Sequence, residues 1–516
     1  MESLFDRVTT HPYYSLVAVL VAITCLRYAN NLRRAVASPL SNIPGPWYAP
    51  LTSLHLSRAF ATGEIWKTVQ AAHMEYGPIV RLGPRHIWIA DKDAMQKILM
   101  TVDLPKVAMY AEISRDRASP GLFGEIRQDP HKRLKRFLSP AFTVSYIDNL
   151  EFLFAKCIEE LISRYTSLLD EHLVVNARPA CVTDLMDDIH KLALDIMGEC
   201  SFGRGFGQTS PGKQIEQDET DDIWRSIPPS IFKGMRRRYQ QTVYFKRFLR
   251  RLGLDLKFDW PKEMTTAIHS IIHQRTTVEA SVRSDLLQHM VEEGKRPDSG
   301  SKMATRDIVD QMAEILLAGS ETTSGTIACV FLELVRHPHV KKKLMASLPV
   351  LQPTEPIVSS KTVRTDARYE YLEACIRETL RLHPIASEMG RRTGKEPIEL
   401  CGYLLPPHTV VSASYRDLHR NPAYWPQSLR FWPERWLAHR PPKVPSPDMH
   451  AYYPFSAGKH SCIGKNFAWA EMRMVTANLL SRFNFTEVPG QEIDYRQYIT
   501  MQFQHGSWQV VLTPRY

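Results

Sequence analysis

The chain has 516 residues, of which 44% are hydrophobic and 23% are charged, and this composition excludes a wholly disordered or collagen-like protein. Its formal net charge of +10 is a mild excess for this length, which favours an acidic surface or partner without naming one. The eight cysteines are scattered and form no Cys-x-x-Cys pair, which argues against a disulfide scaffold or a structural zinc cluster and fits a reducing compartment.

The first fifty residues are organised differently from the rest. Residues 8–26 carry no formal charge and are mostly apolar from residue 13 on, enough for a helix that just crosses a hydrocarbon layer of roughly 30 Å. The run lacks the basic start and the small-residue cleavage site of a secretory signal peptide, which is the alternative interpretation. We therefore predict an uncleaved membrane anchor over residues 1–34.

Three arginines (Arg27, Arg33 and Arg34) follow the apolar run, and the positive-inside rule then keeps the remainder of the chain in the cytosol. Pro44-Gly45-Pro46 is a stiff segment that a helix or strand cannot absorb, so residues 35–50 are predicted to be a proline-rich hinge. After residue 50 no Gly/Ser-rich or charge-run linker interrupts the chain. One large domain is therefore expected over residues 51–516.

Periodicity along this domain predicts a mainly α fold with small β-sheets. Two strand pairs are expected, residues 79–82 with 86–90 around Gly83-Pro84-Arg85, and residues 398–401 with 409–414 around Pro406-Pro407. Helical spacing covers most of the remainder. The predicted helices are residues 148–170, 184–200, 262–293, 305–336, 368–382 and 467–483.

The helix predicted over residues 305–336 is unusually long, about 48 Å at the standard helical rise, and ends at a His337-Pro338 stop signal. Its middle, residues 319–325, holds two glycines and four hydroxyl residues that can compete for backbone carbonyls. Apolar residues on both sides predict that this section is buried and locally opened as a functional bulge. A surface-exposed polar turn is the alternative.

Residues 455–464 lie just before the helix-spaced run that begins at Phe467, and they place Cys462 at the mouth of a helix. Free backbone N–H groups and the positive end of the helix dipole stabilise a thiolate there. Gly458 and Gly464 allow the backbone to turn tightly or to lie against something flat. A lone cysteine is usually a small core residue, but this setting favours a nucleophile or a soft-metal ligand, including the sole protein ligand of a heme iron.

The segment from Phe455 to Gly464 resembles the heme-binding loop of the cytochrome P450 family, F-x-x-G-x-R/H-x-C-x-G, with His460 at the Arg/His position. Three further segments follow in the order that the family has. Residues 318–322 resemble its A-G-x-D/E-T, residues 378–381 resemble its ExxR, and residues 431–436 resemble its P-E-R-F/W segment. Each match is weak alone, but together they identify a resemblance over nearly the whole chain, to microsomal, fungal-type members in particular.

The resemblance implies the cytochrome P450 fold, with heme b bound through Cys462 as the axial ligand of its iron. It also implies a structural triad of Glu378, Arg381 and Arg435 that locks the cysteine loop, since three charges in a core must satisfy one another. Thr322 and Glu321 are implied to be the alcohol and acid that handle protons beside bound oxygen. For Glu378 with Arg381 the alternative is an ordinary surface ion pair.

The two propionates of heme need cations, which the family usually supplies from a W-x-x-x-R pair on an early helix. His131 and Lys135 align with these positions, and Arg136 could replace Lys135, because a lysine lacks the arginine fork. Further implied partners are His460 and either Arg391 or Arg392. The alternative for residues 131–136 is a solvated basic face that docks an acidic redox partner. The implied substrate pocket includes Ala313, Leu317, Ala318 and Ile385.

These features predict a monooxygenase that inserts one oxygen atom from O2 into a hydrophobic small molecule, in fungal specialised-metabolite biosynthesis. Electrons would come from NADPH-cytochrome P450 reductase, with cytochrome b5 as an optional donor, because the chain shows no flavin or NAD fingerprint. The alternatives are a hydroperoxide-using heme-thiolate isomerase or dehydratase and a non-catalytic heme-binding protein. Nucleic acid is not an expected partner.

The expected location is the endoplasmic reticulum membrane, with a single membrane span and a cytosolic catalytic domain. A glycosylation sequon begins at Asn484 within that domain, and a cytosolic location predicts that it stays unmodified. The basic stretch over residues 236–257 could be a second contact with the anionic leaflet, or an ordinary solvated helix face.

Overall fold

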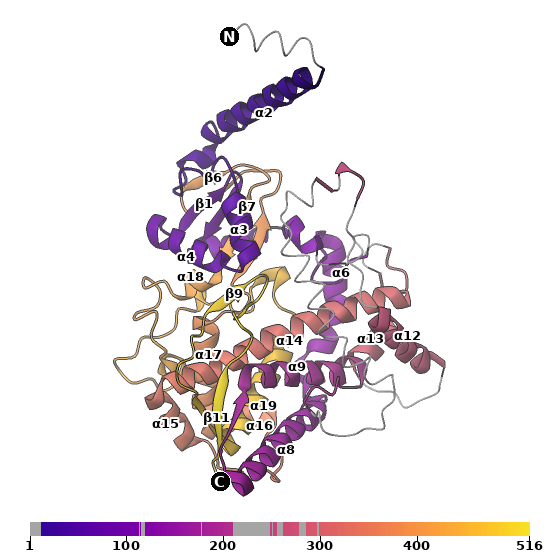
Figure 1. The fold of residues 1–516 in the computed structure, drawn as a ribbon, viewed down its shortest axis with the longest axis vertical. Helices are drawn as coiled ribbons and strands as arrows, with labels where there is room; N and C mark the ends of the chain where they lie inside the picture. The colour runs from indigo at the N-terminus through magenta and orange to yellow at the C-terminus, as the bar shows by residue number, and fades with distance from the viewer. Residues whose placement is uncertain are drawn as a thin grey trace.

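The computed structural model describes residues 12–112, 114, 119–176, 178–209, 248–249, 251–254, 262–277, 285–296 and 299–516. Helices dominate this part of the chain, and the strands form small sheets (Figure 1). The α-helices are α2 (Pro12–Val36), α3 (Leu54–Thr62), α4 (Ile65–Tyr76), α5 (Lys92–Gln96), α6 (Gln128–Leu138), α7 (Val144–Asp148), α8 (Glu151–Asn176), α9 (Leu185–Phe202), α12 (Lys262–Thr277), α13 (Leu286–Glu293), α14 (Thr305–Arg336), α15 (Pro338–Ser347), α16 (Ser360–Thr365), α17 (Glu370–Leu382), α18 (Tyr415–His419) and α19 (Lys465–Arg482). The prediction of a mainly α fold with small sheets is confirmed.

The helix α14 passes through the middle of the body and packs against α9, α17 and α19 (Figure 1). Its bounds, Thr305–Arg336, are those that the sequence predicted. Buried residues of these helices and of α8 form the main hydrophobic core. The helix α14 is therefore the central element against which the surrounding helices pack.

The predicted opening of α14 in its middle is wrong, because the backbone is α-helical from end to end. The Ser320 and Thr322 hydroxyls donate to the carbonyl oxygens of Leu316 and Ala318 at 2.8 and 2.6 Å. These bonds reach back one turn and run beside the backbone hydrogen bonds without replacing them. The predicted burial is correct for most of the section, including Ser320, Thr323 and Ser324.

The remaining predicted helices form with shifted ends, as α8, α9, α17 and α19. The stretch predicted over residues 262–293 contains two helices, α12 and α13, and residues 278–284 between them lie outside the described part of the chain. Arg275 of α12 forms an ion pair with Asp285 just before α13, at 2.6 Å. The side chain of Asp285 also accepts a hydrogen bond from the Gln288 backbone, which caps the start of α13.

The first predicted hairpin is confirmed, since β1 (Ile79–Gly83) pairs antiparallel with β2 (His86–Ile89). Strand β7 (Val410–Ser414) joins the same sheet, parallel to β2 and antiparallel to β4 (Glu388–Arg392). The other strands are β3 (Cys181–Asp184), β8 (Phe483–Glu487) and β11 (Gln509–Pro514) in one sheet, β9 (Tyr495–Gln497) with β10 (Met501–Phe503), and β5 (Ile398–Leu400) with β6 (Tyr403–Leu405).

The second predicted strand pair is wrong, because β5 pairs with β6 and not with β7. Cys401 and Gly402 separate β5 from β6, and both have positive φ angles, 51° and 77°. Two such residues form the tight turn that a two-residue hairpin needs. The chain therefore reverses before it reaches Pro406-Pro407.

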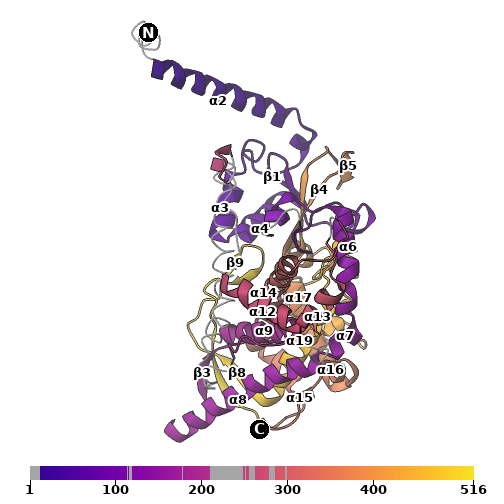
Figure 2. The same ribbon diagram turned by 90° about the vertical axis from the view of Figure 1, so that its right-hand side faces the viewer.

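The N-terminal helix α2 projects away from the body in both views (Figures 1 and 2). Its large apolar side chains are exposed, and Leu16, Leu20 and Leu26 are more than half exposed. Within the described residues, only α14 is long and apolar enough to cross a membrane, and most of its apolar section is buried inside the protein. The apolar section within α2 is shorter, Leu16–Asn30.

The predicted basic stretch and the cysteines remain to be placed. The basic stretch 236–257 lies outside the described residues except for 248–249 and 251–254. All eight cysteines are free in the structure.

Candidate active site

Glu378 and Arg381 lie three residues apart on α17, and their side chains pair at 2.8 Å with no exposed surface on either. Arg435, which belongs to a short 3-10 turn (Pro433–Trp436), approaches the same carboxylate at 3.4 Å and is also fully buried. The Trp432 backbone N–H and the Trp436 indole N–H donate to Glu378 at 3.0 and 2.9 Å. The surface ion-pair alternative is therefore excluded.

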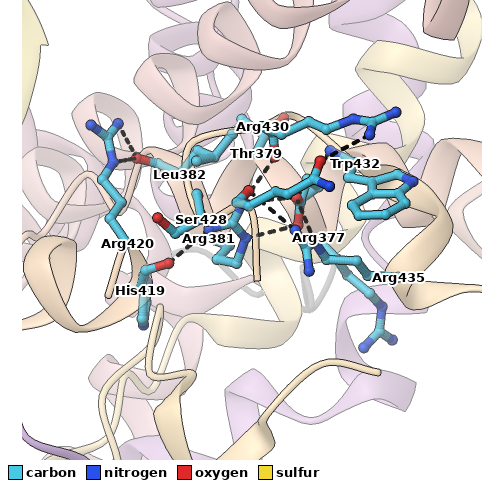
Figure 3. A network of polar contacts seen from close by, with 12 residues as sticks. Arg377, Thr379, Arg381, Leu382, His419, Arg420, Ser428, Arg430, Trp432 and Arg435 are labelled. Carbon is cyan, nitrogen blue, oxygen red and sulfur yellow. Dashed lines mark hydrogen bonds and ion pairs between the residues drawn. The ribbon is translucent and has the colours of Figure 1, made fainter. Parts of the chain in front are cut away.

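Arg381 carries the network further into the chain (Figure 3). Its guanidinium donates to the carbonyl oxygens of His419 and Ser428, both at 2.7 Å, and to that of Arg430 at 3.2 Å. Since these three acceptors are backbone groups, Arg381 fixes the course of residues 419–430 in addition to pairing with Glu378. The arginine thereby links α17 to the segment that leads toward the cysteine loop.

The loop that carries Cys462 begins after a short 3-10 turn, Gly458–His460, and ends where α19 starts. The Cys462 N–H donates to the Phe455 carbonyl oxygen at 2.9 Å, which closes the loop. Gly458 has a φ of +69°, and a Cβ there would lie 1.9 Å from the Leu99 carbonyl oxygen, so only glycine fits. The sequence-predicted tight turn is thus present at Gly458.

The thiol of Cys462 is accessible on its loop but surrounded by the protein at longer range. Burial raises the pKa of the Cys462 thiol, whereas the Gly464 N–H and the charges of Lys135 and Lys465 oppose that rise. The neighbourhood thus supplies a hydrogen-bond donor and two cations to a thiolate.

A group of basic side chains faces the same region from three parts of the chain. Arg391, on β4, is fully buried, and its Nε, Nη1 and Nη2 atoms have no hydrogen-bond partner among the described residues. The His460 Nδ1 atom is likewise buried and unpartnered, and the His460 ring lies 4.4 Å from that of His131. Burial is the main reason that the pKa of His131 is lowered to about 3 and that of His460 to about 2, and the charges of Lys106 and Arg391 act in the same direction.

Lys106 completes this group, and the sequence analysis did not find it. It forms an isolated backbone bridge with Arg391, and burial, together with the Arg391 charge, lowers the pKa of Lys106 to about 7. A buried guanidinium with all its donors free is costly unless an anion meets it. The cluster Lys106, His131, Arg391 and His460 therefore fits the acidic side groups of a heme whose iron is bound by a thiolate.

Three other predicted cations are placed differently. Of Arg391 and Arg392, Arg391 is buried and Arg392 is exposed. Of Lys135 and Arg136, Lys135 is half-buried and Arg136 is exposed. Lys135 donates from Nζ to the carbonyl oxygens of Lys459 and Ser461 at 2.9 and 2.8 Å. It thus contacts the backbone just before Cys462.

On α14, Thr322 and Glu321 point to different partners. The Thr322 hydroxyl donates to the Ala318 carbonyl oxygen, whereas the Glu321 carboxylate accepts a hydrogen bond from the Thr500 hydroxyl at 2.9 Å. Burial raises the pKa of Glu321. The two side chains are adjacent in sequence, and the structure gives no direct hydrogen bond between them in the described region.

The predicted pocket residues differ in exposure. Ala313 and Ile385 are buried, at 0% and 5% exposed, whereas Leu317 is half-buried and Ala318 is exposed. Glu314, which the sequence analysis missed, lies one helical turn before Ala318 and two before Thr322, so the three share a face of α14. The signal available in the sequence was an acidic residue within an apolar run of the predicted helix.

Glu314 holds a neighbouring segment against α14. Its carboxylate accepts hydrogen bonds from the Ser114 hydroxyl at 2.5 Å and from the Phe123 and Gly124 N–H groups at 3.2 and 3.3 Å. Gln311, one turn earlier, accepts from the Leu122 N–H at 3.1 Å. The segment 120–124 is therefore tied to the face of α14 that leads to Thr322.

A buried ExxR pair, a glycine-dependent cysteine loop and unpartnered buried basic side chains are the features that the sequence resemblance implied. Residues 43–505 match the family model named Cytochrome P450. The chain is 31% identical to Cytochrome P450 monooxygenase LUC2 of Fusarium sp, over 93% of this chain and 89% of that one. It is 31% identical to Cytochrome P450 monooxygenase FUS8 of Gibberella fujikuroi, over 100% and 96%. Benzoate 4-monooxygenase bphA of Aspergillus niger is 28% identical, over 92% of each chain.

The chain therefore belongs to the cytochrome P450 family, and it is an oxygen-incorporating oxidoreductase, a heme-thiolate monooxygenase. The family binds heme through a cysteine thiolate, receives electrons from redox partners, and uses O2 and hydrophobic substrates. The relatives named above are monooxygenases, and they lend no support to the isomerase, dehydratase or non-catalytic alternatives.

Proposed function

We propose that Cys462 is the axial ligand of heme b and that the enzyme inserts one oxygen atom from O2 into a hydrophobic small molecule. The observation that carries this proposal is the buried, unpartnered guanidinium of Arg391, together with the unpartnered Nδ1 atom of His460, which lies two residues before Cys462 in the chain. These groups need an anion, and the side groups of heme provide it. Arg391, His460, Lys106 and His131 would hold those groups, while Phe455, Gly458 and Gly464 shape the loop.

When bound, the heme supplies an iron centre that reduces and cleaves O2, with the thiolate donating electron density. Glu378, Arg381 and Arg435 keep the proximal part of the fold rigid through buried ion pairs and backbone contacts. Their proposed contribution is to hold the loop of Cys462 in one position.

Thr322 and Glu321 have the proposed role of handling protons beside bound oxygen. The Thr322 hydroxyl, now bonded to the Ala318 carbonyl oxygen, would rotate to hold a water molecule on the substrate side of α14. Burial raises the pKa of Glu321, which makes its carboxyl group easier to protonate than an exposed one. The Thr500 hydroxyl would be the neighbour that exchanges this proton.

The proposed substrate is an apolar molecule of the terpenoid, polyketide or alkaloid-like class in fungal specialised metabolism. The proposed pocket residues Ala313, Leu317, Ala318 and Ile385 are all apolar, and Ala313 is fully buried. The proposed location is the endoplasmic reticulum membrane with the catalytic domain in the cytosol. The apolar, exposed side chains of α2 support this location, because such a helix needs a covering.

NADPH-cytochrome P450 reductase is the proposed electron donor, with cytochrome b5 as an optional one. Basic side chains are exposed around the cysteine loop and on α6, and an acidic protein surface would complement them. They include Lys132, Arg136, Lys459 and Lys465.

Reconstitution with the reductase tests this function. The heme-loaded full chain, reductase and NADPH are incubated under labelled O2 with candidate substrates, and product mass and NADPH use are measured. We expect substrate-dependent NADPH consumption and one labelled oxygen atom per product. Turnover with hydroperoxides alone, and no substrate-dependent use of NADPH across a broad apolar panel, would contradict the proposal.

A further inference from the structure

Lys135 occupies the position at which the family resemblance placed a heme propionate contact, but its contacts lie elsewhere. Its ammonium donates to the Lys459 and Ser461 carbonyl oxygens at 2.9 and 2.8 Å and to the Ser461 hydroxyl oxygen at 2.9 Å. A lysine ammonium has three N–H donors, and three acceptors are present. No donor is left over for a further anion.

We propose that Lys135 is a positioning residue for the loop of Cys462 and not a contact for the acidic side groups of heme. This inference rests on the proposed role of Cys462 as the iron ligand. The two carbonyls and the hydroxyl belong to the residues that immediately precede this cysteine along the chain. Holding them sets the direction in which the chain enters Cys462.

The loop is fixed from inside by two backbone bonds, and Lys135 adds a third support from α6. The Ser461 N–H donates to the Gly458 carbonyl oxygen at 3.1 Å, and the Cys462 N–H donates to that of Phe455 at 2.9 Å. The Ser461 carbonyl oxygen accepts from the Lys135 ammonium at 2.8 Å. The lysine thus supplies both a hydrogen bond and a positive charge next to the sulfur-bearing residue.

The acidic groups have other polar side chains available. Arg391 keeps all three guanidinium nitrogens free among the described residues, and the His460 Nδ1 atom is also free. Lys106 uses two of its donors on the Leu122 and Phe123 carbonyl oxygens, both at 3.0 Å, and the described residues give its third donor no hydrogen-bond partner. Arg391, His460 and Lys106 would therefore contact the acidic groups of heme, whereas Lys135 contacts the loop of Cys462.

A cation held near a thiolate stabilises negative charge on the sulfur and reduces its donation to the metal. The reduced iron, which carries one more electron, is stabilised by that cation more than the oxidised iron is. Removing the charge at Lys135 should therefore lower the reduction potential of the heme iron. A lost contact with acidic side groups would instead loosen heme binding.

The test compares Lys135→Met with Lys132→Met, which removes the same charge from an exposed position one turn earlier on α6. Heme content per chain, the reduction potential and the reduced carbon monoxide spectrum are measured on each purified holoprotein. For Lys135→Met we expect wild-type heme content, a lower potential and faster loss of the thiolate-type band. Lys132→Met should match the wild type, and Arg391→Met should lose heme.

Two further variants distinguish a loss of the Lys135 contacts from a general failure of the protein to fold. Lys135→Arg keeps a cation and should restore the potential, and Ser461→Ala removes one acceptor and should shift it less than Lys135→Met does. Loss of heme from Lys135→Met at unchanged potential, or equal potentials for Lys135→Met and Lys132→Met, would overturn the inference. Absence of the thiolate-type band in the wild type would instead contradict the proposed function itself.

Discussion

Glu378 and Arg381 form an ion pair at 2.8 Å in which neither side chain has any exposed surface. Such a pair contributes little by its mutual attraction, because both charges lose their hydration. Its effect comes from the hydrogen bonds that each partner makes to other segments. Glu378 reaches Trp432 and Trp436, and Arg381 reaches the backbone of His419.

Glu378→Gln should therefore destabilise the protein by about 3–5 kcal/mol, because Arg381 and Arg435 would keep buried charges without a carboxylate. Denaturant unfolding followed by tryptophan fluorescence measures the change. Lys67→Met is the control, since Lys67 pairs with Asp494 at 2.6 Å on a largely exposed surface, and such pairs contribute below about 1 kcal/mol. Equal effects of the two variants would refute the structural role of the buried network.

Thr322→Ala should leave heme content and substrate binding intact but lower the product formed per NADPH severalfold. The removed hydroxyl is the group proposed to hold water on the substrate side of α14, so electrons would end as peroxide or water. Thr326→Ala is the matched control, because the Thr326 hydroxyl makes the same one-turn bond, to the Thr322 carbonyl oxygen at 2.9 Å. If both variants keep the wild-type ratio of product to NADPH, Thr322 is only part of the helix.

Glu314→Ala should loosen residues 120–124, because it leaves the Phe123 and Gly124 N–H groups without their acceptor. Each lost bond of this kind costs about 1–3 kcal/mol locally, which corresponds to about 5- to 150-fold faster amide exchange. Hydrogen exchange with mass spectrometry measures this segment. Glu314→Gln can still accept from the two amides and bond Ser114, so it should retain protection. Identical exchange in all three proteins would show that Glu314 does not hold the segment.

The topology prediction concerns Asn484, which lies in β8 opposite Thr513 of β11. If the residues after α2 face the cytosol, the glycosylation machinery never meets this sequon. Full-length protein from a eukaryotic host should carry no glycan at Asn484, as judged by mass spectrometry. A glycosylation tag placed before residue 1 provides the control and should be modified. Glycan at Asn484 would reverse the predicted orientation.

Patterns within one stretch of sequence predicted well. The long apolar run without proline, closed by His337-Pro338, gave the bounds of α14, and the Gly83-Pro84-Arg85 signal gave the first hairpin. The second pair failed because Pro406-Pro407 outweighed the Cys401-Gly402 turn, which requires two positive φ angles. Only glycine among these residues announces that requirement in a sequence.

Contacts between distant segments were the part that the sequence could not supply. Lys106 is brought beside Arg391 by a backbone bridge between residues almost three hundred positions apart. The choice between Arg391 and Arg392 depends on which side of β4 faces the core, and both residues have the same chemistry. Lys135 was aligned with the correct helix, but its three acceptors lie in the cysteine loop, and spacing along the chain does not reveal such contacts.

The identity of the iron ligand is tested most directly by the reduced carbon monoxide spectrum of Cys462→Ser beside that of the wild type. A serine oxygen is a harder and weaker donor than a thiolate, so the variant should lose the thiolate-type absorption and the monooxygenase activity. Cys401→Ser, which alters another free cysteine away from α19, should keep both. A Cys462→Ser protein that retains the thiolate-type band and full activity would show that another cysteine binds the iron.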